Sequence, residues 1–279
     1  MTASAPEHFN ALAGQYAASE VHVNNPTIWR LHELLAPKRP DSVCDVACGP
    51  GHLALSFAGK VSRIVGVDAA PNMLRQFEKL AKERGVEVET VQAYAEKVPL
   101  PSNSFDLVVS RLAPHHYPDV VKAVREMARL AKSGGCVAVI DLEGSENPIL
   151  DGLNHEIEVL HDPTHIRSYS AARWQEFFKT NGLSVEALEP GQTELPGGLA
   201  VGRWCEIGHT EQEALTQIRA RLAAAPREQL AELGIRFENG EFYIPVRTVI
   251  ILGRKCQSDL IMKVVQRAVY APAFPPQVA

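Results

Sequence analysis

The stretch VCDVACGPGHLALSF, residues 43–57, limits the fold more than any other part of this 279-residue chain. Gly49 and Gly51 follow an apolar run that contains Asp45, and Ala54 stands three residues further on. This spacing, G-x-G-x-x-A, is that of a dinucleotide-binding loop, in which the chain turns sharply from a strand into a helix. Glycines suit such a turn because a ligand can approach a backbone that carries no Cβ atom. The motif predicts an α/β fold with a ligand at the end of its first strand.

Short β-branched runs alternate with amphipathic runs from about Ser42 onward. In the run 71–85, Leu74, Phe77 and Ala81 share one face and charged residues take the other. The strands are apolar almost throughout, which is typical of a parallel sheet covered by helices on both faces. We expect strands at 42–47, 63–68, 86–92, 105–110 and 136–142, and helices at 52–59, 71–85 and 118–132.

Beyond Leu142 the alternation is looser. The pair Asn239-Gly240 is a hairpin signal. The apolar strand at 246–252 follows it too closely for a crossover helix, so we expect this strand to be antiparallel to its neighbour. The predicted fold is a Rossmann-like, seven-stranded, mostly parallel sheet with an antiparallel last strand, helices on both faces and further helices over the site. We also expect helices at 148–160 and 170–182, a sixth strand at 183–189, and two short helices within 210–233.

Composition narrows the class of partner. The net charge is -5 and no long run of Lys or Arg occurs, so the chain lacks the electrostatic footprint of a protein that binds nucleic acid or an anionic membrane. No apolar run reaches the roughly 20 residues that span a bilayer, and the N-terminus lacks a signal pattern. We expect a cytoplasmic protein with a small-molecule partner, and leave open whether it forms a homodimer.

The cysteines and histidines predict no metal site. Five scattered cysteines form neither a disulfide framework nor a C-x-x-C pair. His161 and His165 have the spacing of ligands on one helical turn, but Pro163 interrupts that turn.

Two acidic residues distinguish between ligands of the glycine turn. Asp45 ends the first strand where a dinucleotide's pyrophosphate would lie, so its carboxylate would repel phosphate and attract an ammonium or sulfonium group. Asp68 ends the second strand, where it can accept hydrogen bonds from both ribose hydroxyls of NAD or of an adenosyl ligand. Together they favour a cationic adenosyl ligand.

Four motifs now identify a family. DVACGPG, GVDAAPNML, AYAEKVPLPSNSFDLVVSRLAPHHYPD and LAKSGG resemble, in order, those of class I S-adenosylmethionine-dependent methyltransferases. The likeness is greatest to the branch that includes the ubiquinone and menaquinone biosynthesis methyltransferases, and it covers about residues 9–188. Four motifs in this order are specific for the fold and the cofactor, and they say little about the methyl acceptor.

The resemblance implies S-adenosyl-L-methionine as cofactor and S-adenosyl-L-homocysteine as product. It implies that Asp45 lies near the cofactor's ammonium, that Asp68 holds the ribose, and that Ala95 offers its N–H to the adenine. Ala47 stands where the general pattern has a glycine, and Tyr94 stands where the family commonly has an aspartate. By this likeness the cofactor-binding residues are Tyr16, Asp45, Ala47, Gly49, Gly51, Asp68, Ala69, Met73, Tyr94, Ala95, Arg111 and Leu112.

Two histidines are candidates for the acceptor side. The motif RLAPHHYP follows the fourth strand, so His115 and His116 leave the sheet at the edge where ligands of α/β sheets bind. We expect His116, and His115 as the second candidate, to act as general base or orienting group. An ordinary imidazole pKa near 6.5 would leave the ring mostly neutral at pH 7.

The expected organisation is one methyltransferase domain over residues 1–279. It comprises a helical lid (1–41), an α/β core (42–190 and 235–254), an acceptor-side insertion (191–234) and a tail (255–279) with a helix at 258–270. The expected activity is methyl transfer to a small or medium organic acceptor such as a secondary metabolite or quinone-like compound. A cofactor-binding protein of the same fold with another activity, such as a cyclase, stays an alternative, as does an NAD-dependent oxidoreductase, which Asp45 and the final hairpin disfavour.

Overall fold

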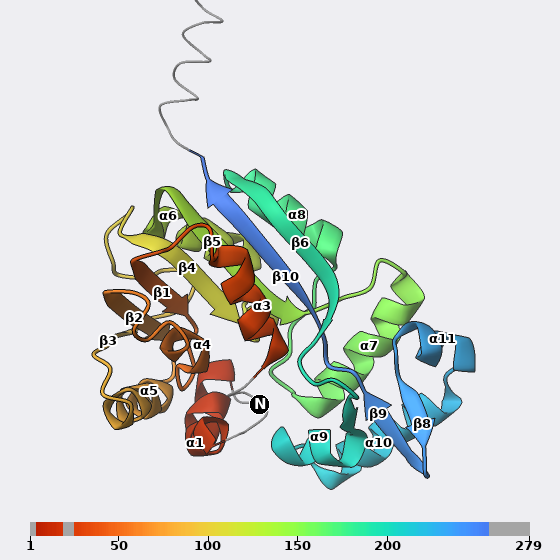
Figure 1. Cartoon of the computed structure of the whole chain (residues 1–279). Coiled ribbons are helices and arrows are strands. Elements are labelled where there is room, and N and C mark those ends of the chain that lie inside the picture. Colours follow the sequence, from red (N-terminus) through yellow and green to blue (C-terminus); the bar gives the residue numbers. More distant parts are fainter. Residues whose placement is uncertain (1–3, 19–24, 257–279) are drawn as a thin grey trace, which may run out of the picture.

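Seven strands form one sheet in the order β3-β2-β1-β4-β5-β10-β6 (Figure 1). The computed structural model describes residues 4–18 and 25–256. Only β10 runs against its neighbours, β5 and β6, which confirms the predicted mostly parallel sheet with an antiparallel last strand. The strands are β1 (Ser42–Val46), β2 (Arg63–Asp68), β3 (Glu89–Gln92), β4 (Phe105–Arg111), β5 (Ala131–Leu142), β6 (Leu183–Thr193) and β10 (Arg247–Lys255).

Helices cover both faces of this sheet. On one face α3 and α4 bury Leu31 and Leu53 against the apolar strands, and on the other α6 and α8 bury Met127 and Trp174. Ser170 caps α8 by accepting from the Arg173 N–H, as its position in the sequence predicts. The helices around the main sheet are α1 (Ala5–Ala18), α3 (Pro26–Leu35), α4 (His52–Leu55), α5 (Pro71–Glu83), the 3₁₀ turn η1 (Pro114–His116), α6 (Val120–Leu130), α7 (Pro148–His161) and α8 (Ala171–Thr180).

A smaller sheet, β7-β9-β8, stands beside α7 with three helices around it. Asn239 and Gly240 both have positive φ, so the predicted hairpin is confirmed. It lies outside the core sheet in which we expected it, because β9 pairs with β7 and its apolar side packs with Ile157 of α7. The elements are β7 (Leu199–Ala200), α9 (Val201–Ile207), α10 (Gln212–Ala224), α11 (Arg227–Glu232), β8 (Arg236–Glu238) and β9 (Glu241–Ile244).

Helix α6 ends at Leu130, two residues early, because Ala131 is extended and pairs with Phe105 of β4. The helix expected at 258–270 lies outside the described residues. None of the helices in the described ranges is both long enough and apolar enough to cross a membrane.

Candidate functional site

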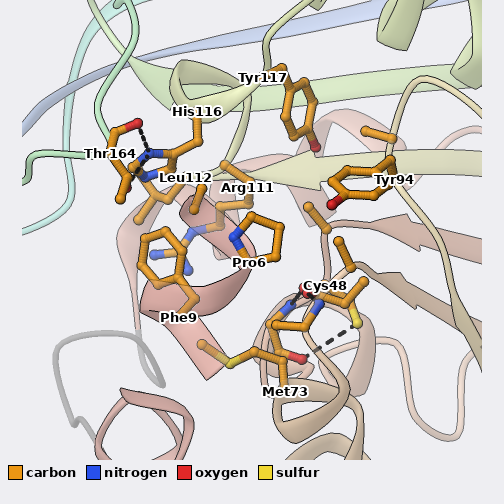
Figure 2. A pocket seen from close by; sticks show the side chains of 18 of the residues that line it. Pro6, Phe9, Cys48, Met73, Tyr94, Arg111, Leu112, His116, Tyr117 and Thr164 are labelled. Carbon is orange, nitrogen blue, oxygen red and sulfur yellow. Dashed lines mark hydrogen bonds between the residues drawn. The ribbon is translucent and has the colours of Figure 1, made fainter. Parts of the chain in front are cut away.

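A cavity of about 520 Å³, here called the main cavity, opens at the carboxyl ends of β1, β2 and β4 (Figure 2). Helix α1 and the η1 turn contribute the opposite wall. The main cavity brings together all but two of the residues that sequence reasoning singled out, and those two are Gly51 and His115. The predicted residues that line it are Tyr16, Asp45, Ala47, Gly49, Asp68, Ala69, Met73, Tyr94, Ala95, Arg111, Leu112 and His116.

The two glycines of the turn have different roles. Gly49 has φ 53° and faces the main cavity, where a Cβ atom would meet only Met73 Sδ at 4.0 Å. Gly51 has φ 85°, and a Cβ atom there would lie 1.9 Å from Phe77 Cδ2. A Cβ atom on Gly66 of β2 would also meet the same ring, at 2.4 Å from Phe77 Cε1. Gly51 therefore lets α5 pack onto the turn and β2, while Gly49 leaves room for a ligand.

Two residues other than glycine hold a left-handed backbone at the cavity wall. Ala47 after β1 has φ 54°, and Leu112 after β4 has φ 49°. This conformation costs an L-residue about 1 kcal/mol or more. Glycine adopts this conformation without that cost, in keeping with the glycine of the general pattern that position 47 resembles. Backbone strain at two neighbouring strand ends, both facing one cavity, is typical of a binding site.

Asp68 supports the glycine turn as well as the cavity. Its Oδ2 accepts from the Gly49 N–H at 2.9 Å, and its Oδ1 accepts from the Ala70 N–H at 2.8 Å. Burial raises the pKa of Asp68, and these backbone donors oppose that shift. Each carboxylate oxygen keeps a second acceptor site for a ligand hydroxyl. Sequence reasoning predicted the ligand contact and missed the backbone contacts.

Asp45 is a buried carboxyl group in the same wall. It is 1 % exposed, and its Oδ2 accepts from the Ala54 N–H at 3.1 Å. Burial raises the pKa of Asp45 to about 7, although the Ala54 N–H and the positive charge of Arg111 favour the ionised form. A cationic group placed in the main cavity would favour ionisation further, so this wall suits an ammonium and not a phosphate.

Arg111 belongs to a buried ion pair that the sequence did not reveal. Its Nη2 donates to Glu194 Oε2 at 2.6 Å, and the other carboxylate oxygen accepts from Thr27 Oγ1 at 2.8 Å. The side chains of Arg111 and Glu194 are 6 % and 2 % exposed. Through Glu194, the residue after β6, these contacts join the end of β4 to α3. No local sequence pattern predicts them, because Glu194 is 83 residues from Arg111 and 167 residues from Thr27.

Helix α1 closes one side of the main cavity. Its Phe9 ring stands edge-on to Tyr16 at 5.6 Å and to His116 at 4.9 Å between ring centroids. The Tyr16 carbonyl accepts from His52 Nε2 at 3.1 Å. Asn72 at the start of α5 donates two hydrogen bonds of 2.8 Å to Asn10, from its backbone N–H to Oδ1 and from Nδ2 to the backbone carbonyl. The predicted N-terminal cover is therefore docked on the turn and on α5.

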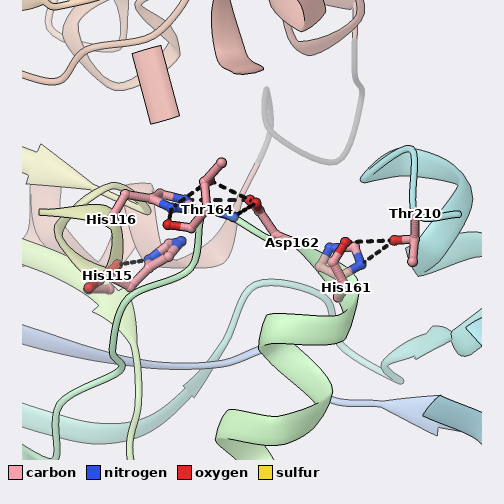
Figure 3. A network of polar contacts seen from close by, with 7 residues as sticks. His115, His116, His161, Asp162, Thr164 and Thr210 are labelled. Atoms are coloured by element: carbon pink, nitrogen blue, oxygen red, sulfur yellow. Dashed lines mark hydrogen bonds and ion pairs between the residues drawn. The ribbon is translucent and has the colours of Figure 1, made fainter. Parts of the chain in front are cut away.

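His116 faces the main cavity in an environment that differs from the one expected. Its Nδ1 lies 3.1 Å from both the carbonyl and Oγ1 of Thr164, and its Nε2 lies 3.7 Å from Asp162 Oδ2 (Figure 3). Burial, with the neighbouring His115, lowers the pKa of His116 to about 3. The expected value near 6.5 is therefore wrong, and the ring stays neutral far below pH 7.

His115 points away from the main cavity. Its Nδ1 lies 2.6 Å from Asp141 Oδ1 at the end of β5, and both side chains are buried. Burial would lower the pKa of His115, but the Asp141 carboxylate outweighs it, and the pKa is raised. The two adjacent histidines thus have opposite environments, and His115 holds the η1 turn on the sheet.

Tyr94 and Ala95 form the outer end of the main cavity. Ala95 is buried, whereas Tyr94 is 59 % exposed and has its ring at the cavity mouth (Figure 2). A ring in this place can stack on a flat ligand group without losing a hydrogen bond inside the protein.

Proteins described as methyltransferases resemble this chain in sequence and in structure. A family model described as "Methyltransferase domain" matches residues 44–139. YcgJ of Bacillus subtilis, named an uncharacterized methyltransferase, is 33% identical over 221 residues, which are 79% of this chain and 86% of that protein. Its crystal structure aligns with a TM-score of 0.74 at 31% identity, covering 83% of this chain and 99% of the other. A demethylmenaquinone methyltransferase of Listeria welshimeri is 29% identical over 50% of this chain and 65% of its own length.

Proposed function

This chain belongs to the methyltransferase family, and from that premise we propose that it transfers a methyl group from S-adenosyl-L-methionine to a small or medium organic acceptor. The observation that carries the choice of cofactor is the pair of carboxyl groups, Asp45 and Asp68, on one cavity of about 520 Å³. A ligand that joins an ammonium group to a ribose suits both residues, because Asp45 attracts the ammonium and Asp68 can accept hydrogen bonds from the ribose. The negative charge of Asp45 would instead repel a pyrophosphate.

The residues of the main cavity fit the cofactor. Asp68 would accept from the ribose hydroxyls with its remaining lone pairs, and Asp45 would receive the ammonium group. Gly49 keeps the turn free of side-chain atoms on the cavity side. Tyr94 would stack on the adenine, and the Ala95 N–H would donate a hydrogen bond to it. These two residues would hold the adenine because no aspartate stands at position 94. When bound, the cofactor supplies an electrophilic methyl group on a sulfonium centre.

The protein's own task is to hold the two reactants and exclude water. In-line displacement needs the acceptor atom at near-attack distance, and correct positioning alone can supply much of the rate. On the side that we assign to the acceptor, the lining of the main cavity includes the apolar residues Pro6 and Phe9 of α1, Leu112 and Ile166. We propose an acceptor with an aromatic or quinone-like body that fits among these side chains.

The experiment that tests this function is ligand titration followed by an acceptor screen. S-adenosyl-L-homocysteine should stabilise the protein by about 2.7 kcal/mol at a hundredfold excess over Kd, and NAD and NADP should not. Incubation with S-adenosyl-L-methionine and a panel of phenols, amines and quinols should then yield S-adenosyl-L-homocysteine with the correct acceptor. Stabilisation by NAD alone would contradict the proposal. Tight cofactor binding without turnover on any acceptor would favour the alternative of a binding protein or cyclase.

We further propose that His116 orients the acceptor and takes no proton from it. A base is most effective when its pKa lies near the working pH, and burial holds the pKa of His116 at about 3. His116→Gln, which keeps a hydrogen-bonding group, should retain kcat within about threefold, and His116→Ala should raise KM about tenfold. Between pH 5.5 and 8, titration of His116 should not lower the kcat of the wild type. The pH profiles of kcat for the wild type and for His116→Gln should therefore have the same shape.

The matched control is His209→Gln, because His209 is an exposed histidine outside the main cavity. A loss of about a hundredfold in kcat for His116→Gln, together with loss of an acidic limb, would instead establish His116 as the general base.

A further inference from the structure

A second cavity of about 550 Å³ lies between the end of β5, helix α7, the start of α8 and the segment that joins α11 to β10. Among the described residues it shares no lining residue with the main cavity. Part of its wall is apolar, formed by Leu142, Leu150, Ile235 and Ile244, and the rest is polar. A cavity of this size accommodates a small organic molecule.

Glu158 of α7 is the notable residue in this wall. The residue is buried, with 9 % of its surface exposed, and it lines the second cavity. Within residues 4–18 and 25–256 its carboxyl group makes no hydrogen bond and no ion pair. Burial raises its pKa to about 7, and the positive charge that acts on it most belongs to His115, which is already paired with Asp141. A buried carboxylate without a partner is costly, and a positive group in the cavity would offset that cost.

The other charged side chains of the second cavity are exposed to solvent or already paired: Glu146 accepts from the Ala172 N–H at 3.3 Å, and Glu232 is exposed. Arg247 lies 3.3 Å from Glu143 and also donates to the Glu232 carbonyl. Glu143 accepts from the Gly191 N–H at 2.8 Å. The one guanidinium in the described wall is thus held at the rim, and an ionised Glu158 keeps an uncompensated negative charge.

We propose that the second cavity binds an organic ammonium ion, whose charged nitrogen pairs with Glu158 and whose hydrocarbon part lies against Leu142, Leu150 and Ile244. The carboxylate selects a cation, and the apolar wall selects one with a hydrocarbon body over an inorganic ion. This site is additional to the proposed methyl transfer and does not depend on it, because the two cavities are separately lined.

Calorimetric titration at pH 8 with n-butylammonium, 1-butanol and butyrate tests the proposal on the full chain. S-adenosyl-L-homocysteine is present in excess so that the probe does not report on the main cavity. We expect n-butylammonium to bind with a millimolar Kd, and the neutral and anionic analogues to bind at least about tenfold more weakly. Glu158→Gln should raise the Kd for n-butylammonium about tenfold. Asn154→Phe, which fills the cavity from the same helix, should abolish binding.

The matched control is Glu156→Gln, an exposed glutamate two residues away on α7, which should leave binding unchanged. Equal affinity for 1-butanol, or an unchanged affinity in Glu158→Gln, would overturn the assignment, as would no binding of n-butylammonium up to about 50 mM. If S-adenosyl-L-homocysteine itself fails to bind, only the proposed function is contradicted. The affinities of Glu158→Gln and Glu156→Gln for n-butylammonium still test whether the second cavity binds an ammonium ion.

Discussion

Replacing Asp68 by asparagine should raise the Kd for S-adenosyl-L-homocysteine at least about a hundredfold while the protein stays folded. The change removes the charge behind the two hydrogen bonds that we propose Asp68 accepts from the ribose, each worth about 1.5 to 3 kcal/mol. It also turns an amide NH₂ group toward one of two backbone donors, the N–H of Gly49 or of Ala70. The glycine turn should therefore loosen at the same time. Isothermal titration and circular dichroism on the same samples measure both effects.

Glu87→Gln is the control for Asp68→Asn, because Glu87 is exposed before β3 and outside the main cavity. It removes the same charge and should leave the affinity unchanged. An unaltered Kd in folded Asp68→Asn protein would remove Asp68 from the ligand site and leave it only its backbone contacts.

Replacing Gly51 by alanine should lower the free energy of unfolding by about 3 to 5 kcal/mol. The new methyl group would lie 1.9 Å from Phe77 Cδ2, and φ of 85° is unfavourable for alanine. The Phe77 ring cannot withdraw easily, because Gly66 of β2 is in close contact with its other edge. Urea denaturation measures the loss directly, and the melting temperature should fall by roughly 10 °C.

Gly59→Ala separates the clash from the backbone strain. Gly59 has φ 71°, and beyond its chain neighbours no atom lies within 4 Å of the place that a Cβ atom would take. This variant should therefore lose only about 1 to 2 kcal/mol. Combining Gly51→Ala with Phe77→Leu should cost less than the sum of the two single changes. Equal losses at Gly51 and Gly59 would show that ring packing is not what requires a glycine at position 51.

Local patterns made much of this fold predictable. Alternating apolar strands and amphipathic helices set the parallel core, and the residues at the carboxyl ends of β1, β2 and β4 had to meet at one edge. Topology therefore predicted that Asp45 and Asp68 lie close together, and both residues line the main cavity. Helix α9 was missed because its seven residues lie in a polar, glycine-containing stretch and carry no caps that sequence reveals.

Contacts between segments that are far apart in the chain could not be predicted from local sequence patterns. The Glu194 carboxylate meets Arg111 only after β6 has joined the far side of the sheet. The pKa of His116 depends first on its burial, and then on the adjacent His115 and on Asp162, which follows α7. The hairpin at Asn239 was recognised from its own two residues, but its partner strand β7 was not, because pairing depends on tertiary structure.

The direction of β10 has a practical consequence for handling this protein. Because β10 is antiparallel, it begins beside the carboxyl edge of the sheet and ends at the opposite edge, where Arg254 pairs with Cys136 (Figure 1). Helix α1, by contrast, lines the main cavity from Ala5 onward. An affinity tag or immobilisation anchor ahead of α1 would start at the mouth of the cavity and compete with its ligands. The same attachment made at the exposed Cys256, directly after β10, would start on the far side of the sheet from the main cavity, which makes that position the one to use for biosensor capture and activity screening.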